Sequence, residues 1–367
     1  MKPYTIGFIG LGLIGGSIAK AIRRVQPDFR IIACDQSRSN LIAALSDGTL
    51  NETHDTLSEA FGSCDIIFLC APVSINIEYL TLLKPIISEN CIVTDVGSVK
   101  TTIHQASESI GMSHCFIGGH PMAGSEKTGF QNASDRLIEN VYYLLTPSQN
   151  VAKEKYDQLR ALILSISAIP VTLDYREHDR ITAAISHLPH IIAYALVNLV
   201  RLADNSDQIM RRLAAGGFKD ITRIASSSPI MWQQICEENA PQIQNILHTY
   251  IDSLKEISEA IDAHDDAFLL EHFSLARDYR NDIPASHTKS VLSSIHEIYV
   301  DIIDESGAIA TIATILATNG ISIKNIGIVH NREFQEGALR IEFYENEAML
   351  KAIDLLRRFH YVVHERN

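Results

Sequence analysis

Short apolar runs alternate with helically spaced apolar residues along the first half of the chain. Ile14, Ile18 and Ile22 recur at helical spacing between the first two runs. The runs cover residues 4–9, 31–34, 65–71, 91–96, 115–117, 141–145 and 169–173. Strand-length runs that alternate with helical stretches are typical of a doubly wound parallel sheet. We therefore expect an α/β domain over residues 1–173.

The middle of the chain changes to helical periodicity. Ser186-His187-Leu188-Pro189-His190 opens an apolar face that continues through Ile191, Ala195 and Leu199. This pattern predicts an all-α domain over residues 174–288. His187 and His190 share a face if the helix continues through Pro189, and we expect one packed core histidine and one site histidine. His178 and Asp179 are nearby, but no metal-binding spacing such as H-E-x-x-H is present, so no metal is expected.

A third pattern follows a predicted linker at residues 283–289. Residues 297–303, 321–328, 338–343 and 361–364 resemble strands, and residues 308–316 and 345–359 resemble helices. The order β-α-β-β-α-β predicts a small ferredoxin-like domain over residues 296–367.

Composition excludes several classes of partner. The net charge of −13 argues against a nucleic acid or an anionic membrane, although a small anionic substrate needs only a local cluster of cations. The six cysteines contain no Cys-x-x-Cys pair and are expected to be buried thiols in a reducing compartment. The apolar N-terminus carries glycines in strand-turn-helix spacing and is not expected to be a signal peptide, and no apolar run is expected to span a membrane. These features predict a cytoplasmic protein.

A glycine fingerprint predicts dinucleotide binding. Gly10-Leu11-Gly12-Leu13-Ile14-Gly15 follows the first predicted strand, opens a helix and precedes a second strand that ends in Asp35. In such a Rossmann-like turn the first glycine permits the bend, the second admits a pyrophosphate and the third permits close packing. Asp35 is placed for the ribose hydroxyls, which favours NAD over NADP, whereas Arg38 slightly favours NADP.

Other polar positions follow the same strand ends. Ala71-Pro72, Ser98 and His120 each come after a predicted strand, so they and the glycine turn are expected to share one site. His120 lies in a glycine-rich loop at residues 118–129 and is a candidate general base, with helix capping as the alternative. Arg223 is a candidate clamp for a carboxylate, with an Arg223–Asp220 salt bridge on a helix face as the alternative.

Three motifs in order resemble the prephenate dehydrogenase family. They are Gly-Gly-His-Pro-Met-Ala-Gly, Ser-His-Leu-Pro-His and Phe-Lys-Asp-Ile-Thr-Arg, and the resemblance covers about residues 4–290. It implies NAD-dependent oxidative decarboxylation of prephenate to 4-hydroxyphenylpyruvate in tyrosine biosynthesis, with arogenate as the alternative substrate. It implies that His120 takes the C4 hydroxyl proton, that Ser98 holds that hydroxyl and that His190 and Arg223 bind carboxylates. It also implies pocket roles for Glu126, Asp179, Asp220 and Trp232, an intertwined homodimer or higher homo-oligomer, and a Trp232 supplied by a partner subunit.

The C-terminal segment resembles an ACT domain, which commonly pairs with a second copy and binds an amino acid. This resemblance implies L-tyrosine as a feedback inhibitor, with Asp304, Ser306, Gly307 and Ser322 as candidate regulatory positions. Serine replaces the usual proline at 306, and Ser322 replaces an asparagine. A purely structural dimerisation module is the alternative. For the whole chain, a non-catalytic NAD-binding sensor and a β-hydroxyacid dehydrogenase are the rival functions, although the latter family's lysine motif was not found.

Overall fold

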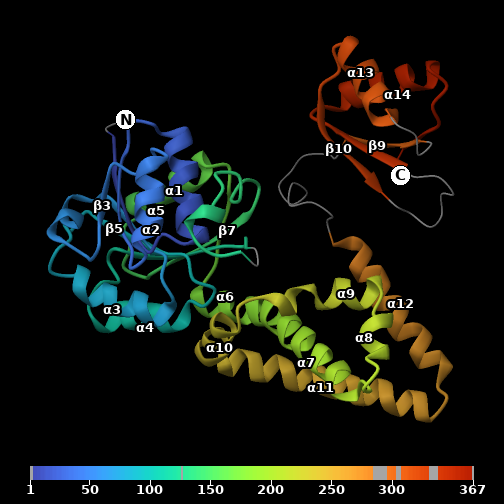
Figure 1. Ribbon diagram of the computed structural model, residues 1–367, viewed down its shortest axis with the longest axis horizontal. Helices are drawn as coiled ribbons and strands as arrows, with labels where there is room; N and C mark the ends of the chain where they lie inside the picture. Colours follow the sequence, from blue (N-terminus) through green and yellow to red (C-terminus); the bar gives the residue numbers. More distant parts are fainter. Residues whose placement is uncertain (1–2, 125–126, 284–295, 303–306, 330–337, 366–367) are drawn as a thin grey trace. The chain divides into compact units, whose positions relative to one another are not determined.

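The computed structural model describes residues 3–124, 127–283, 296–302, 307–329 and 338–365. The chain divides into two compact units, Met1–Tyr279 and Arg280–Asn367 (Figure 1). Glu126, Asp304 and Ser306 lie outside the described residues. The limits of the three predicted domains stay predictions.

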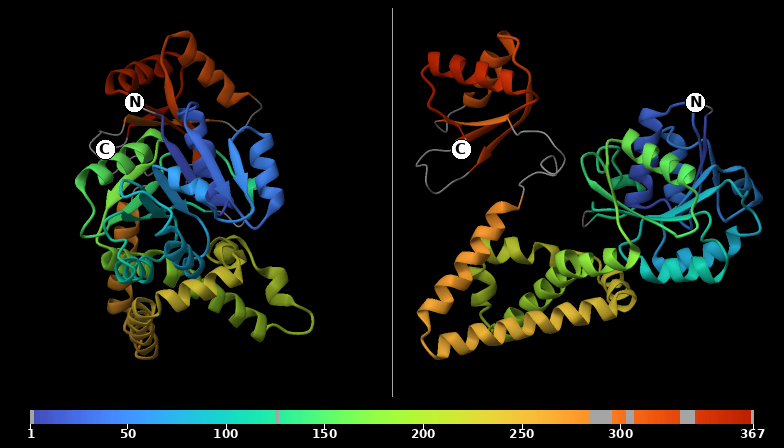
Figure 2. Two further views of the ribbon diagram at one scale, coloured as in Figure 1. Left: turned by 90° about the vertical axis from the view of Figure 1, so that its left-hand side faces the viewer. Right: turned by 180° about the vertical axis from the view of Figure 1, so that it is seen from behind.

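The first unit begins with an eight-stranded sheet in the order β3-β2-β1-β4-β5-β6-β7-β8. Its strands are β1 (Thr5–Ile9), β2 (Arg30–Cys34), β3 (Glu52–His54), β4 (Ile66–Leu69), β5 (Ile92–Asp95), β6 (Phe116–Pro121), β7 (Tyr142–Pro147) and β8 (Ile169–Thr172). Helices cover both faces, as the views in Figure 2 show. The helices are α1 (Leu13–Val25), α2 (Arg38–Ser46) and α5 (Lys153–Ser165) on one face, and α3 (Val73–Leu83) and α4 (Thr101–Ser109) on the other. Two short 3-10 turns, Glu59–Ser63 and Phe130–Asn132, complete this part.

Continuous apolar strands explain why both faces of the sheet are covered. In β2, Ile31 and Ala33 pack beneath α1, whereas Ile32 and Cys34 face the opposite layer. Successive strand residues point to opposite faces, so an unbroken apolar run needs two helical layers. Burial of each large aliphatic side chain stabilises the fold by about 1.5–3 kcal/mol.

The prediction of a wholly parallel sheet is wrong at one edge. β7 pairs antiparallel with β6, and β8 then runs parallel to β7. The described residues between β6 and β7 contain no crossover helix, only the short turn Phe130–Asn132. A connection of this kind favours an antiparallel neighbour.

The expectation that His120 lies in a loop is also wrong. His120 belongs to β6, is buried, and lies opposite Leu144 of β7. The glycines before it allow the neighbouring strand to pack closely and do not make the segment flexible. A Cβ at Gly119 would lie 2.6 Å from the Asp95 carbonyl oxygen. Helix capping by His120 is excluded by the same placement in a strand.

The second part of the first unit is helical, with α6 at its junction with the sheet (Figure 1). Its elements are α6 (Tyr175–Thr182), a π-helical turn (Ala183–His187), α7 (Leu188–Ala203), α8 (Ile209–Leu213), α9 (Gly216–Thr222), a 3-10 turn (Arg223–Ser226), α10 (Pro229–Glu238), α11 (Ala240–Asp262) and α12 (Asp266–Asp282). The helix does continue through Pro189, which lies in the first turn of α7 directly after the π-helical turn. A wider turn of this kind accommodates a residue without a backbone N–H.

The continuous helix Tyr175–Ala203 corrects the expectation about membrane spans. It is the one helix among the described residues that is long and apolar enough, by length and composition, to cross a membrane. Its first turns, which form α6, contact α4 and β7 of the sheet-containing part and carry polar site residues described below.

The second unit has the element order that the third pattern predicts. It contains β9 (His296–Asp301), α13 (Ala308–Thr318), β10 (Ile323–Val329), β11 (Ala338–Phe343), α14 (Asn346–Arg358) and β12 (Val363–Glu365). The four strands form an antiparallel sheet in the order β10-β11-β9-β12. Ile298, Val300 and Leu316 lie in its core. Assignment of this unit to the ACT family stays a prediction.

Candidate active site

The glycine turn has the geometry that a dinucleotide requires. Gly10 has φ +89°, and a Cβ there would lie 2.9 Å from the carbonyl carbon of Cys70. A Cβ at Gly15 would lie 2.7 Å from the Gly10 carbonyl oxygen, whereas one at Gly12 would meet nothing within 4 Å. The open side of Gly12 therefore faces space in which a pyrophosphate fits. Leu13 and Ile14 begin α1, whose first turn has no acidic residue, so its N–H groups and dipole favour an anion.

Asp35 lies at the end of β2 beside this turn. Its carboxylate accepts hydrogen bonds from the backbone N–H of Leu11 and, at 2.6 Å, of Ser37. The contacts hold the carboxylate at the entrance to α1, where ribose hydroxyls would approach. Arg38 is exposed and pairs with Asp55 at 3.4 Å, so a carboxylate already neutralises part of its charge.

The segment after β4 forms a second fixed turn. The Asn76 side chain accepts from the N–H of Ala71 at 3.1 Å and donates to the Ala71 carbonyl at 2.8 Å. Pro72 is exposed at the start of α3. These contacts fix Ala71 and Pro72 at the carboxyl end of β4, next to the Gly10 turn.

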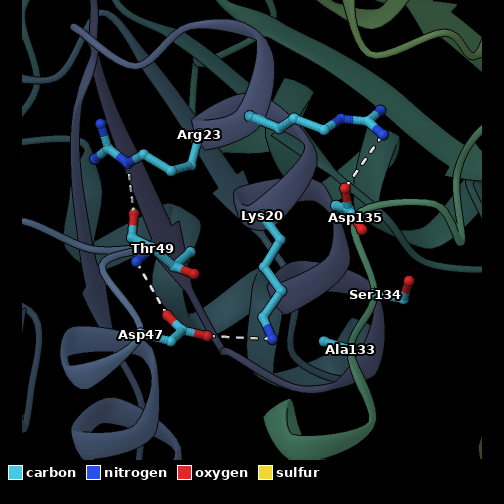
Figure 3. A pocket seen from close by; sticks show the side chains of 8 residues that line it. Lys20, Arg23, Asp47, Thr49, Ala133, Ser134 and Asp135 are labelled. Carbon is cyan, nitrogen blue, oxygen red and sulfur yellow. Dashed lines mark hydrogen bonds and ion pairs between the residues drawn. The ribbon is translucent and has the colours of Figure 1, made fainter.

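A separate pocket lies against the C-terminal half of α1 (Figure 3). Lys20 pairs with Asp47 at 3.2 Å, and Arg24 pairs with Glu139 at 2.6 Å. Arg23 donates to backbone carbonyls, including that of Thr49 at 3.1 Å. These cations already have partners, and the pocket shares no lining residue with the predicted site.

Three polar side chains form a hydrogen-bonded chain that ends at His120. His120 Nδ1 lies 2.8 Å from His178 Nε2, and His178 Nδ1 lies 2.8 Å from Asp179 Oδ1. Asp179 also accepts from the backbone N–H groups of Lys100 and Thr101, each at 2.8 Å. All three side chains are buried.

This chain determines which nitrogen of His120 is basic. A carboxylate only accepts, so His178 Nδ1–H donates to Asp179 and His178 Nε2 accepts from His120 Nδ1–H. The unprotonated Nε2 of His120 is then left to accept a proton. Burial lowers the pKa of His120 well below the ordinary value of 6.5, and His178 and Lys100 lower it further. His120 is therefore a neutral base at physiological pH.

A buried ion pair joins the segments that carry Ser98 and His120. The Lys100 ammonium contacts the Asp95 carboxylate, and both side chains are 0% exposed. Asp95 also accepts from Gly97 N–H at 2.9 Å and from Gly119 N–H at 3.1 Å. One carboxylate thus holds the turn before Ser98 and the strand residue before His120, and Ser98 itself is half-buried.

A second cluster forms around Trp232. His190 stacks on the indole with ring centroids 3.7 Å apart, and Trp232 also packs against Val99, the neighbour of Ser98. His190 Nδ1 donates to the Ser186 carbonyl at 3.0 Å, which leaves Nε2 for a ligand. Burial lowers the pKa of His190, and the charge of Arg223 lowers it further, so Arg223 lies within electrostatic reach of His190. Trp232 lies beside histidines of its own chain, and its expected contribution to a partner's site stays a prediction.

The structure therefore brings together most of the predicted substrate residues. Asp220 is exposed on α9 and stays a predicted site residue. The sequence interpretation missed three buried residues: Asp95, Lys100 and His178. Asp95 and Lys100 flank Ser98 in Asp-Val-Gly-Ser-Val-Lys. A lysine among apolar residues is the feature of the sequence that could have indicated a buried ion pair here. His178 had been considered only as a metal ligand.

Comparisons with known proteins identify the family of this chain. The model of the prephenate dehydrogenase nucleotide-binding domain matches residues 18–171, and that of the prephenate dehydrogenase dimerization domain matches residues 174–275. The chain is 38% identical over 353 residues to a prephenate dehydrogenase of Bacillus subtilis, covering 95% of this chain and 94% of that protein. It is 30% identical over 283 residues to a cyclohexadienyl dehydrogenase of Zymomonas mobilis, covering 77% of this chain and 97% of the relative.

A solved structure extends the likeness to three dimensions. The prephenate dehydrogenase of Aquifex aeolicus, in complex with hydroxyphenyl propionate and NAD+, superposes with a TM-score of 0.73 at 30% identity. The match covers 77% of this chain and 99% of that one. This structure and the Zymomonas mobilis relative thus correspond to about three quarters of this chain, whereas the Bacillus subtilis relative matches nearly all of it.

Proposed function

The chain belongs to the prephenate dehydrogenase family and is an NAD-dependent enzyme, and we propose that it converts prephenate into 4-hydroxyphenylpyruvate. The reaction transfers a hydride from C4 of the substrate to NAD as the C4 hydroxyl gives up its proton, and the ring carboxylate leaves as CO2. The electron pair of the broken C–C bond makes the ring aromatic, and the resulting phenolate oxygen takes a proton back. The ring becomes aromatic, so the protein mainly has to bind, orient and remove one proton.

The observation that carries the proposal is the chain from Asp179 through His178 to His120. These hydrogen bonds leave His120 Nε2 unprotonated. This nitrogen can accept the proton of the C4 hydroxyl as C4 becomes a carbonyl. The Gly12 turn and Asp35 would hold the pyrophosphate and ribose of NAD, which when bound would supply the hydride acceptor. Ser98 lies on the turn that Asp95 ties to β6, which suits it to hold the same hydroxyl. A sensor that only binds NAD has no need of such a base.

The direct test is oxidation of substrate in solution. The purified chain mixed with prephenate and NAD is expected to produce NADH, seen as a rise in absorbance, together with 4-hydroxyphenylpyruvate. Arogenate is the alternative substrate, and the ratio of kcat/KM for the two decides between them. No NADH with either substrate would contradict the proposed function and favour the sensor. NADP in place of NAD should be poorer, because a 2′-phosphate would approach the Asp35 carboxylate.

The carboxylate end of the substrate is assigned to His190, Arg223 and Trp232. Arg223→Ala is expected to raise the KM for prephenate about 10- to 100-fold with little change in kcat, because it removes a charge-assisted contact made equally before and during reaction. Initial rates at several prephenate concentrations measure it. Arg201→Ala, at an exposed arginine of α7, is the matched control and should behave as wild type. An unchanged KM in Arg223→Ala would leave the Asp220 salt bridge as the role of Arg223.

The helical part offers surfaces for a second copy of the chain. Leu202 and Leu213 are each 74% exposed and Leu270 is 70% exposed, and apolar side chains at this exposure are typical of a subunit interface. Their location within the region matched by the dimerization-domain model supports a homodimer or higher homo-oligomer.

A cytoplasmic location is proposed from the relatives' biosynthetic activity and the free cysteines.

Feedback control by L-tyrosine is proposed for the second unit. Gly307 has φ +95° at the start of α13, with nothing within 4 Å of an added Cβ, and Ser322 is exposed. The open helix start offers N–H groups to an amino acid carboxylate. A chain that ends at Ile283 is expected to keep its activity and lose inhibition by tyrosine, because whole relatives match about that length. Dose–response curves for the full and shortened chains measure this. Identical inhibition of both would place tyrosine at the active site and contradict the regulatory proposal.

A further inference from the structure

His187 is a buried histidine that the proposed chemistry does not use. It ends the π-helical turn that precedes α7 and is 1% exposed. Its ring meets Trp232 edge-on, with centroids 6.0 Å apart and an angle of 77°. The Asn239 side chain joins it to Asp179, which is linked through His178 to His120. His187 therefore lies between the hydrogen-bonded chain of His120 and the Trp232 cluster.

The hydrogen bonds of Asn239 determine the tautomer of His187. The Asn239 amide nitrogen donates to the Asp179 carbonyl at 2.9 Å, which fixes the orientation of the amide. The same nitrogen lies 3.2 Å from His187 Nδ1. An amide nitrogen only donates, so Nδ1 must accept and the ring proton must reside on Nε2. Burial lowers the pKa of His187 to about 4, so the ring is neutral at physiological pH.

The Nε2–H of His187 finds no acceptor among the described residues, although it is buried. The indole N–H of Trp232, which is 7% exposed, is likewise without an acceptor. Buried donors are nearly always satisfied, and an unsatisfied one at a catalytic cluster indicates a missing ligand atom. Two such donors on rings that contact each other indicate a place for oxygen atoms of the substrate.

We propose that His187 Nε2–H donates a hydrogen bond to the ring carboxylate of the substrate, the group that leaves as CO2. The inference rests on the proposed function. The C4 hydroxyl of the substrate is already assigned to His120 and Ser98. The side-chain carboxylate, which remains in the product, is assigned to Arg223, so the ring carboxylate is the group left for His187.

A neutral donor suits a carboxylate that must lose its charge. A cation at this position would stabilise the carboxylate of the bound substrate more than the departing CO2 and would oppose decarboxylation. A neutral N–H orients the carboxylate and loses less when the charge disappears. His187 is therefore a substrate-binding residue with selectivity for prephenate over its decarboxylated product.

Two variants separate this role from a structural one. His187→Asn keeps an amide near the Nδ1 position, where Asn239 can still be met, and removes the donor at the Nε2 position. His187→Gln reaches the Nε2 position with an amide N–H. His187→Asn is expected to raise the KM for prephenate about tenfold, the usual effect of losing a hydrogen bond to a charged group. The KM for NAD and the dissociation constant of 4-hydroxyphenylpyruvate, which lacks the ring carboxylate, should stay within about twofold.

The outcomes are distinct. Recovery of most of the prephenate affinity in His187→Gln, with thermal midpoints near that of wild type, supports the proposal. An unchanged KM in His187→Asn overturns it, as does equal weakening of prephenate and 4-hydroxyphenylpyruvate, which would place the donor on the carboxylate that remains. If His187→Asn does not fold, His187→Gln alone decides. The proposal is then overturned if this variant prefers prephenate over 4-hydroxyphenylpyruvate less strongly than wild type does. Failure of wild type to oxidise prephenate would instead contradict the proposed function. Binding of 4-hydroxyphenylpyruvate is measured by calorimetry, which does not depend on turnover.

Discussion

His120→Asn is expected to lower kcat by at least about 10²-fold, the usual loss when a general base is removed. Asparagine retains a polar group near Nδ1 for the contact with His178 but has no basic nitrogen at the Nε2 position. The KM for NAD should stay unchanged, because the glycine turn proposed to bind the cofactor does not involve His120. Steady-state rates measure kcat, and fluorescence titration measures NAD binding. His114→Asn, at an exposed histidine, is the matched control. A near-normal kcat would restrict His120 to a structural role.

The pH profile gives a second readout of the same base. The active form is unprotonated, so kcat/KM falls as the pH falls through the pKa of His120 in the free enzyme. Because burial, followed by His178 and Lys100, lowers that pKa well below 6.5, the acid limb should lie below the pKa of an ordinary histidine. An acid limb at or above 6.5 would contradict the buried, neutral assignment.

Asp95→Ala is expected to destabilise the first unit by about 3–5 kcal/mol, the usual cost of leaving a buried charge without its partner. Lys100 is 0% exposed and would lose the carboxylate that compensates its charge. The N–H groups of Gly97 and Gly119 would lose their acceptor at the same time. Urea denaturation followed by circular dichroism measures the loss of stability, and kcat should fall as well because both catalytic segments lose a common anchor.

Two further variants test the cause. Asp95→Ala combined with Lys100→Met should be more stable than Asp95→Ala alone, since it removes the uncompensated charge. Asp252→Ala breaks the exposed pair with Lys255 and should leave stability unchanged within error. Equal stability of Asp95→Ala and wild type would show that the buried pair does not stabilise the fold.

Local features of the chain were predicted well from the sequence. The Gly10–Gly15 turn depends on residues next to each other, because backbone freedom at Gly10 and the lack of a Cβ at Gly15 are local requirements. The helical character of the stretch around Pro189 was predicted from its apolar face, whereas its continuation through the proline was left open and is shown by the structure. The element order of the second unit followed from alternating and helical periodicities, which the core residues Ile298, Val300 and Leu316 reproduce.

Features that join distant segments were decided only by the tertiary structure. Nothing around residue 142 specifies that β7 pairs antiparallel with β6, and this pairing changes the expected loop at His120 into a buried strand. His178 meets His120 across 58 positions of the chain, and the Lys100 backbone meets Asp179 across 79. The amino-acid sequence determined which chemical groups are present and where the glycine turn lies. Packing of the helical part against the sheet decided which imidazole nitrogen is basic, because a tautomer depends on the hydrogen-bond partner that folding supplies.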